Sequence, residues 1–294
     1  MDNNFELKLK VAAEKAEIAL TKYLDTEFTG DTVAADAMRY STLGGGKRIR
    51  AFLVLEFCRL FGGDEKAALP YACAIECVHA YSLIHDDLPC MDNDDMRRGK
   101  PSCHIRFGEA EALLAGDGLL TAAFDIIASN TYVSDRSVRL AAKVLAHEAG
   151  AVGMVGGQVL DMADTVDCYG DLRTIFAKKT SALFTAACLL GYYAAVDAPD
   201  ASVEADIRKY ADCLGVAFQI HDDILDVKSD AATLGKPIGS DAKNDKKTSL
   251  AFFTLDEAEK EEARLTGDAV DAVSAYSGSE TLCSIAQWLL IRKK

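Results

Sequence analysis

Apolar residues recur at helical spacing along most of this chain, and no other feature of the sequence constrains its fold more strongly. Proline, which breaks helices, occurs only five times in 294 residues, and alanine, the best helix former, is abundant. No run shows a convincing strand-like alternation, and the best candidate for a strand, at 165–169, is weak. The sequence therefore predicts an all-helical protein, with helices at 4–24, 47–61, 65–87, 109–130, 135–149, 171–195, 203–227 and 278–291.

Nothing in the sequence marks a boundary between domains. The length fits one large domain or two ordinary ones. No Pro/Ser-rich linker and no low-complexity tract divides the chain. Many helical stretches are apolar on more than one face, as expected of helices around a central core. We therefore expect residues 1–294 to form a single helical domain.

The formal net charge of -14 limits the partners of the chain. Nucleic acids and anionic membrane surfaces both attract basic faces, so neither is an expected partner. The nine cysteines are scattered without a CxxC pair, which favours neither zinc nor disulfides. The N-terminus lacks the apolar core of a signal peptide, and no stretch reads as a membrane span. We expect a cytoplasmic protein with no membrane insertion.

Two similar acidic clusters lie far apart in the sequence. The second, QIHDDILDV at 219–227, has the simpler geometry. An ideal helix turns by about 100° per residue, so Asp222, Asp223 and Asp226 share one arc of an otherwise apolar helix. Unpaired carboxylates there repel each other and resist burial. They therefore either face water or are neutralised by cations.

The first cluster, LIHDDLPCMD at 83–92, lies where its helix must stop. Pro89 cannot continue the hydrogen-bond ladder, so the helix ends with Asp86 and Asp87, and Asp92 returns from the loop. If the two clusters face each other, they form a site for hard divalent cations, and Mg²⁺ is the natural choice where a phosphate shares the coordination. The alternative is that each cluster is a solvated helix end. A calcium-binding EF-hand fits poorly, because the loop lacks the glycine and closing glutamate of that motif.

Basic residues gather beside glycines, beside the first acidic cluster and on one further helix. Any one of these groups is more often surface decoration than a functional site. Together with the aspartates they indicate a cavity for two polyanions, one bound through metals and the other directly by cations. The basic groups comprise Lys47, Arg48 and Arg50 in LGGGKRIRAF, Arg97 and Arg98, Lys178 and Lys179 before Thr180, and Lys236, Lys246 and Lys247.

These motifs resemble those of the short-chain trans-isoprenyl diphosphate synthase family, and within it those of bacterial farnesyl diphosphate synthases. DDLPCMD is similar to the first aspartate-rich motif of the family and DDILD to the second. GGGKRIR, GGQVLD, KKTSALF and LGKPIGSD follow in the family's order, and the match runs from about Tyr40 to the C-terminus. The resemblance implies an all-α bundle of the isoprenoid synthase type around a deep central cavity, usually as a homodimer.

The resemblance also implies a set of site residues. Three Mg²⁺ ions, for which Mn²⁺ can substitute, are expected on Asp86, Asp92 and Asp222, with Asp87, Asp223 and Asp226 in support. The allylic diphosphate is expected on Arg97, Lys179 and Lys236, in a pocket also lined by Thr180, Gln219 and Lys246. Isopentenyl diphosphate is expected on Lys47, Arg50, His79 and Arg98.

The implied reaction is the head-to-tail condensation of isopentenyl diphosphate with dimethylallyl or geranyl diphosphate. Carbon–oxygen cleavage leaves diphosphate and an allylic cation, which the alkene attacks, and the departing diphosphate takes the proton. No side-chain base is needed, so His85 and His221 are interpreted as structural. The resemblance implies that Tyr81 and Ser82 form the floor for the growing chain, and an aromatic floor goes with farnesyl diphosphate in this family. The helical spacing alone does not place Tyr81 there, and it leaves open that Tyr81 is an ordinary core aromatic residue.

Other functions stay open at this point. They are a geranylgeranyl diphosphate synthase, a non-catalytic prenyltransferase subunit, a terpene cyclase, and a protein that sequesters metal or phosphate. The second cluster is all aspartate, unlike that of the cyclases, and the chain keeps both motifs, unlike a typical non-catalytic subunit. Two residues depart from the family pattern, Ala51 in place of a frequent proline and Ser249 in place of an aromatic residue.

Overall fold

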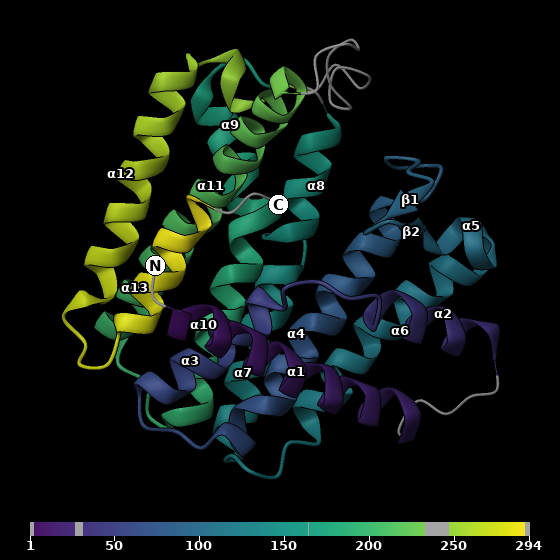
Figure 1. The fold of residues 1–294 in the computed structure, drawn as a ribbon. Coiled ribbons are helices and arrows are strands. Elements are labelled where there is room, and N and C mark those ends of the chain that lie inside the picture. The colour runs from purple at the N-terminus through teal and green to yellow at the C-terminus, as the bar shows by residue number, and fades with distance from the viewer. Residues whose placement is uncertain (1–2, 27–31, 164, 233–246, 292–294) are drawn as a thin grey trace. The chain divides into compact units, whose positions relative to one another are not determined.

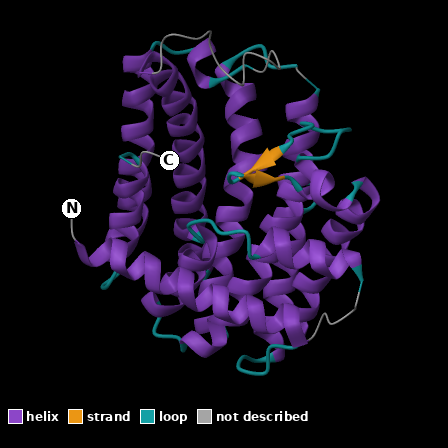
Figure 2. Cartoon of the chain, turned by 45° about the vertical axis from the view of Figure 1, so that its right-hand side comes forward, coloured by secondary structure: helices purple, strands orange, loops and turns teal. Residues whose placement is uncertain are grey.

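The computed structural model describes residues 3–26, 32–163, 165–232 and 247–291. Most of them are helical, which confirms the all-α prediction (Figure 2). They pack into two compact units, 1–144 with 189–198, and 145–188 with 199–294. The chain passes between the units within α7 (Asp135–Ala149) and within α10 (Ala182–Ala195), both labelled in Figure 1, and again after residue 198.

The first unit is organised around α4, whose residues are buried along most of its length. Helices α3 and α6 pack against α4, and α1 packs against both α3 and α4. Asp64 caps α4 by accepting a hydrogen bond from the backbone N–H of Lys66 at 2.9 Å. The helices that lie wholly in this unit are α1 (Asn3–Thr26), α2 (Val33–Thr42), α3 (Ile49–Leu60), α4 (Glu65–Asp86), α5 (Cys103–Phe107) and α6 (Glu109–Ala128).

Helix α4 corrects one expectation from the sequence. It is long and apolar enough to meet the length and composition of a membrane span, although no such stretch was expected. Of its most apolar window, 78% is buried inside the structure. Burial against neighbouring helices accounts for this composition, because a helix that is covered on all sides is apolar on all sides.

A short hairpin follows the first acidic cluster. Strand β1 (Met96–Arg97) pairs antiparallel with β2 (Lys100–Pro101). The two residues between them, Arg98 and Gly99, have positive φ angles of 52° and 74°, as tight hairpin turns require. Strands of two residues are too short to show a sequence alternation, so the hairpin was not predicted. The weak strand candidate at 165–169 was wrong, since the described residues there form no strand.

The second unit contains a helix of 32 residues, α11 (Ala201–Ala232), which packs along α12 (Leu255–Ser274). The helix expected at 171–195 is present, but a π-helical turn interrupts it. Four helices were missed: α2, α5, α8 and α12. Of these, α12 is so rich in charge that its apolar stripe is narrow. The other elements are α8 (Met154–Met162), α9 (Tyr169–Phe176), the π-helical turn η1 (Ala177–Ser181), the 3₁₀ turn η3 (Ser249–Ala251) and α13 (Glu280–Leu289).

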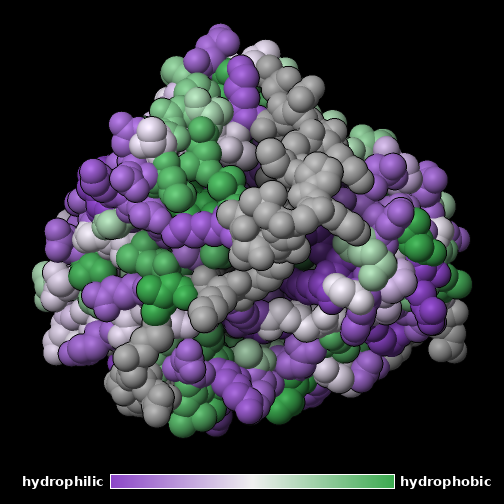
Figure 3. Space-filling model, turned by 45° about the horizontal axis from the view of Figure 1, so that its top comes forward, coloured by the Kyte–Doolittle hydropathy of each residue, from purple (hydrophilic) through white to green (hydrophobic). Residues whose placement is uncertain are grey.

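The surface mixes polar and apolar side chains. Figure 3 shows hydrophilic and hydrophobic residues interspersed over one face. The exposed large apolar residues include Ile105 in α5, and Leu113 and Leu114 in α6. Scattered apolar residues are normal on a protein surface, so these three draw notice only because they occupy two consecutive helices.

Two glycines allow η1 to pack closely against its neighbours. A Cβ atom at Gly157 in α8 would lie 2.3 Å from the backbone nitrogen of Lys179. One at Gly215 in α11 would lie 2.4 Å from the Oγ atom of Ser181. Both distances are shorter than real carbon contacts, so the position of η1 depends on these residues having no side chain.

Replacement of Gly157 by alanine is expected to lower the midpoint of thermal unfolding by several degrees. Its Cβ would overlap backbone, which cannot rotate away, and overpacking costs about 1–3 kcal/mol. Thermal unfolding followed by circular dichroism measures the shift. The matched control is Gly267→Ala in α12, where nothing lies within 4 Å of the added Cβ. This exposed site is expected to gain about 0.5–1 kcal/mol, and equal midpoints for the two variants would contradict the packing argument.

Candidate active site

The first acidic cluster forms the C-terminal end of α4. The helix ends at Asp86, with Asp87 as its cap residue. The chain then turns back, and the backbone N–H of Asp92 donates to the carbonyl oxygen of Asp86 at 2.8 Å. Asp86 and Asp92 are both partly exposed. The turn therefore places the two expected metal ligands of this cluster beside each other at the surface.

Asp87 has a different role from its neighbours, because it is buried and paired with Arg97. The Nε atom of Arg97 lies 3.0 Å from Oδ1 and 3.2 Å from Oδ2 of Asp87, and its Nη2 also donates to Oδ1. Burial raises the pKa of Asp87, while the hydrogen bonds and charge of Arg97 act against that rise. Arg97 also forms an ion pair with Asp94 at 3.5 Å. The hairpin arginine is thus oriented by two carboxylates, a pairing that the sequence did not predict.

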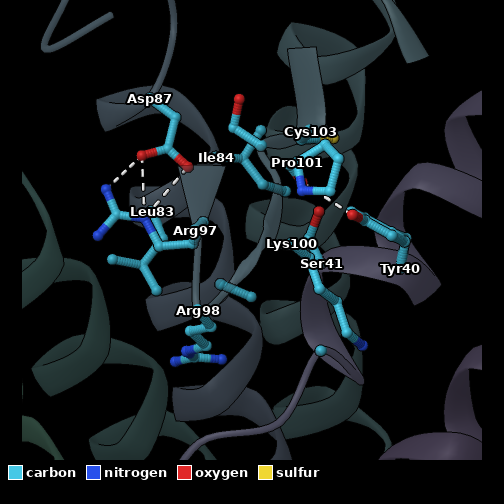
Figure 4. A pocket seen from close by; sticks show the side chains of 13 residues that line it. Tyr40, Ser41, Leu83, Ile84, Asp87, Arg97, Arg98, Lys100, Pro101 and Cys103 are labelled. Atoms are coloured by element: carbon cyan, nitrogen blue, oxygen red, sulfur yellow. Dashed lines mark hydrogen bonds and ion pairs between the residues drawn. The ribbon is translucent and has the colours of Figure 1, made fainter. Parts of the chain in front are cut away.

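Asp87, Arg97 and Arg98 line one pocket of the first unit together with residues of α2 and the hairpin. Figure 4 shows the guanidinium of Arg97 turned toward Asp87, while that of Arg98 points away from this carboxylate. Arg98 instead donates to the carbonyl oxygen of Gly45 at 2.5 Å. The hairpin is thereby fastened to the glycine loop that precedes Lys47.

A group of cations surrounds the middle of α4. Burial lowers the pKa of Arg50 to about 10, while the charge of Glu76 acts against this effect and that of Arg98 adds to it. Burial also lowers the pKa of His79 well below its usual range, and the charges of Arg50 and Arg98 lower it further. His79 is therefore neutral at pH 7, and the group carries a concentrated positive charge. Lys47 lies exposed at the edge of this group.

In the second unit, the π-helical turn η1 carries Lys179 and Thr180. The Oγ1 atom of Thr180 donates to Oε1 of Gln219 in α11 at 3.1 Å. The Nζ atom of Lys179 lies 2.7 Å from Oδ2 of Asp161 in α8. π-Helical turns are rare and are frequent at functional sites. The structure thus brings Thr180 and Gln219 together as expected for one pocket wall, and it adds Asp161 as the partner of Lys179.

The second acidic cluster forms one stripe of α11. Asp222 is partly exposed, Asp226 is exposed and Asp223 is buried. Oδ2 of Asp223 accepts a hydrogen bond from the backbone N–H of Ser249 at 2.7 Å. Ser249 is fully buried. Asp223 therefore fixes the start of η3 against α11.

The two histidines beside the aspartate pairs each contact a neighbouring helix. Nδ1 of His221 lies 2.7 Å from Oε1 of Glu262 in α12. Nε2 of His85 lies 3.1 Å from the carbonyl oxygen of Leu113 in α6. A Cβ atom at Gly116 would lie 2.0 Å from that nitrogen, so the glycine makes room for the ring.

The expected floor residues lie one turn before Asp86. Tyr81 is buried, and its ring packs edge-on against His85 with centroids 5.6 Å apart. Burial, together with the charge of Asp86, raises the pKa of Tyr81 to about 12. Ser82 is partly exposed and donates to the carbonyl oxygen of His79 at 3.0 Å. Tyr81 is thus held in one orientation, with its ring against the neighbouring histidine.

The oxygen donors of both clusters suit Mg²⁺. Within the described ranges, no group of three or more His, Cys, Asp or Glu side chains could hold a metal ion by itself. Mg²⁺ does not need such a cage, because it retains waters and binds through one or two carboxylates together with substrate phosphates. Asp86 beside Asp92, and Asp222 one turn before Asp226, supply carboxylate pairs of that kind.

Two expected site residues are not described in the structure, and two acids of the site were not expected from the sequence. Lys236 and Lys246 fall outside the described residues. The sequence analysis did not assign Asp161, although it lies in the motif GGQVLD, and it did not assign Glu76, three residues before His79. No spacing in the sequence indicated either acid, because each meets its cation from another helix only after the chain has folded.

Comparison with known proteins agrees with this geometry. The family model described as polyprenyl synthetase matches residues 31–276. The chain is 40% identical to the farnesyl diphosphate synthase of Escherichia coli (strain K12), over 99% of this chain and 100% of that protein. It is 42% identical to the chloroplastic geranylgeranyl pyrophosphate synthase 7 of Arabidopsis thaliana, over 88% of this chain and 76% of that protein.

A solved structure extends the agreement to the fold. The apo crystal structure of an FPP/GFPP synthase from Zymomonas mobilis superposes with a TM-score of 0.88 and is 34% identical. The match covers 98% of this chain and 100% of that chain. The resemblance inferred from the motifs and the isoprenoid synthase fold are both confirmed. This chain belongs to the polyprenyl synthetase family and is a prenyltransferase.

Proposed function

We propose that the protein condenses isopentenyl diphosphate with dimethylallyl or geranyl diphosphate, in a Mg²⁺-dependent reaction that gives mainly farnesyl diphosphate. One observation carries the proposal: a single helix, α4, bears two chemically different sites. Its C-terminal end presents Asp86, with Asp92 in the turn that follows, and His79, two turns earlier, lies within the arginine group. The two sites are seven residues apart, or about 10 Å along the helix.

The site in the middle of α4 suits a diphosphate bound without metal. Arg50, Arg98 and Lys47 supply positive charge, and neutral His79 supplies a hydrogen bond. We assign isopentenyl diphosphate to this site, because that diphosphate stays attached to its carbon throughout the reaction. A site for this diphosphate therefore needs fixed positive charge to bind it, and it does not need to stabilise a leaving group.

The end of α4 suits the diphosphate that leaves. Asp86 and Asp92 would hold Mg²⁺ here, with Asp222 holding a third ion, and Mn²⁺ is the proposed substitute. When bound, these ions neutralise the charge that develops on the departing oxygen. Arg97 and Lys179 are each oriented by a carboxylate, Asp87 and Asp161, and both are proposed to bind this diphosphate.

Thr180 and Gln219 would line the same pocket. Lys236 and Lys246 are proposed for it from their motif alone. Asp223 and Asp226 would support the metal ligand Asp222 from the same stripe of α11.

The reaction needs no protein base. The carbon–oxygen bond of the allylic diphosphate breaks, and its electron pair leaves with the diphosphate. The alkene of isopentenyl diphosphate attacks the allylic cation, and the new cation loses a proton to the diphosphate just released. His85 and His221 contact Leu113 and Glu262, which agrees with structural roles for both.

The proposed domain organisation and location rest on the family, and the proposed homodimer rests on the family and on exposed apolar side chains. We propose one domain over 1–294 around a central cavity, a cytoplasmic location and a homodimer. The apolar side chains of Ile105, Leu113 and Leu114, exposed on α5 and α6, offer surface to a second copy.

The purified protein is expected to convert isopentenyl diphosphate and an allylic diphosphate mainly to farnesyl diphosphate when Mg²⁺ is present. Chromatography of the dephosphorylated products measures this, and a chelator is expected to abolish turnover. Farnesol as the main product supports the proposal. Geranylgeraniol would keep the reaction and refute the product length, and an absence of elongation with every allylic substrate would refute the reaction itself.

Replacement of Tyr81 by alanine is expected to shift the main product from farnesyl to geranylgeranyl diphosphate. The buried ring would no longer close the space one turn below Asp86. Tyr81→Phe keeps the ring and serves as the control, with farnesyl diphosphate as its expected product. An unchanged product from Tyr81→Ala, at normal turnover, would show that another residue forms the floor.

A further inference from the structure

Glu76 is a buried acid in the part of α4 that is otherwise surrounded by cations. Its side chain is 2% exposed. Oε2 accepts a hydrogen bond from Nη1 of Arg48 at 3.1 Å, and Oε1 accepts one from the backbone N–H of Ala51, also at 3.1 Å. A carboxylate repels a diphosphate, so Glu76 is not a substrate ligand. Its two hydrogen bonds both lead to the start of α3.

The start of α3 lacks a cap of its own. The N-cap residue, Arg48, makes no side-chain capping hydrogen bond and has a left-handed backbone with φ of 51°. The first N–H groups of a helix have no partner within it, and a buried one costs free energy if it stays unpaired. Ala51 is fully buried. Glu76 therefore supplies, from another helix, the acceptor that the first turn of α3 needs.

Arg48 is fixed by several partners in its unusual backbone conformation. Its Nη2 lies 2.5 Å from Oε2 of Glu17 in α1 and also donates to the carbonyl oxygen of Thr42. A left-handed backbone at a residue other than glycine is sparsely populated and persists only where the surroundings hold it. Glu76 is one of these supports and the one that also contacts α3.

The residues on either side of Arg48 are those assigned to isopentenyl diphosphate. Lys47 precedes it and Arg50 follows two residues later, in the first turn of α3. The backbone angles of Arg48 and the position of the first turn of α3 set the directions of the Lys47 and Arg50 side chains. Glu76 contacts both of these elements.

Ala51 gives this chain a contact that a proline would remove. Proline has no backbone N–H, so a chain with proline at 51 could not donate to Oε1 of Glu76. The departure from the family pattern at this position is thus matched by a buried acceptor on α4. The pair Ala51–Glu76 is a property of this sequence that the motif alone did not explain.

We propose that Glu76 is a positioning residue for the isopentenyl diphosphate site: it caps α3 through Ala51 and holds Arg48, so that Lys47 and Arg50 face the ligand. This inference rests on the proposed function only for the identity of the ligand. The arrangement itself is an anion site, and inorganic diphosphate without metal is a probe that needs no turnover.

Glu76→Gln tests the proposal, because glutamine keeps the shape and cannot accept from Ala51 and Arg48 with two oxygens. The KM for isopentenyl diphosphate is expected to rise about tenfold, with the KM for the allylic substrate within about twofold of its original value. Binding of inorganic diphosphate, measured by calorimetry without metal, is expected to weaken by a similar factor. If Glu76 acted only as a counter-charge, its neutralisation would tighten that binding instead, which would overturn the proposal.

Glu17→Gln is the matched control. It makes the same change of charge beside the same arginine, but Glu17 has no contact with Ala51 and its side chain is 38% exposed. The expected change in either KM is less than about threefold. Equal effects of the Glu17 and Glu76 variants would refute the capping role, and thermal unfolding of each variant shows whether it is folded.

Ala51→Pro separates the capping hydrogen bond of Glu76 from the negative charge of its side chain. Proline is tolerated in the first turn of a helix and removes the N–H that Glu76 accepts. In this background Glu76→Gln is expected to raise the KM for isopentenyl diphosphate by a smaller factor than in the original chain. The same factor in both backgrounds would overturn the proposed contact. A wild-type protein without turnover would refute the proposed function, while the calorimetric comparison would still decide the role of Glu76.

Discussion

Pairing of buried charge governs how this protein presents its cations. Arg97 is held by Asp87, Lys179 by Asp161 and Arg48 by Glu76, each at hydrogen-bond distance. Removing a charge from water is expensive unless a partner and hydrogen bonds replace the lost solvent. Each carboxylate therefore permits a cation to stay partly buried, and it also fixes the direction of that cation. Orientation before binding lowers the cost of holding a multiply charged ligand.

Helix α4 sets the spacing between several residues of the proposed site. Its last three turns carry Glu76, His79, Tyr81 and Asp86. A buried helix is rigid, and each residue advances it by about 1.5 Å, so the spacing of these functions is set by residue number. The proposed capping acid, anion site, chain-length wall and metal-binding end would thus all be positioned by one helix. A separate loop for each function would have to be fixed independently.

The sequence predicted the long helices well, because their apolar periodicity extends over many turns. It missed α12, whose surface charge obscures the stripe, and the hairpin, whose strands have two residues each. Both acidic clusters could be recognised because their residues are adjacent in the sequence. The acidic partners of the cations could not be recognised from the sequence. Asp161 meets Lys179, and Glu76 meets Arg48, only after the helices have packed. Asp223 illustrates the same limit. Its motif indicated a metal site, whereas in the structure its carboxylate accepts a hydrogen bond from the backbone N–H of Ser249.

The π-helical turn at 177–181 has a consequence for how this region can change. Such a turn contains one residue more than the α-helical turn it replaces. Deleting one residue there would restore a regular helix and rotate all that follows relative to what precedes by about 100°. Exchanging side chains at Lys179 or Thr180 leaves that rotation untouched. The direction of the helix after this turn therefore depends on the number of residues in the turn, which an insertion or deletion would change and a substitution would not.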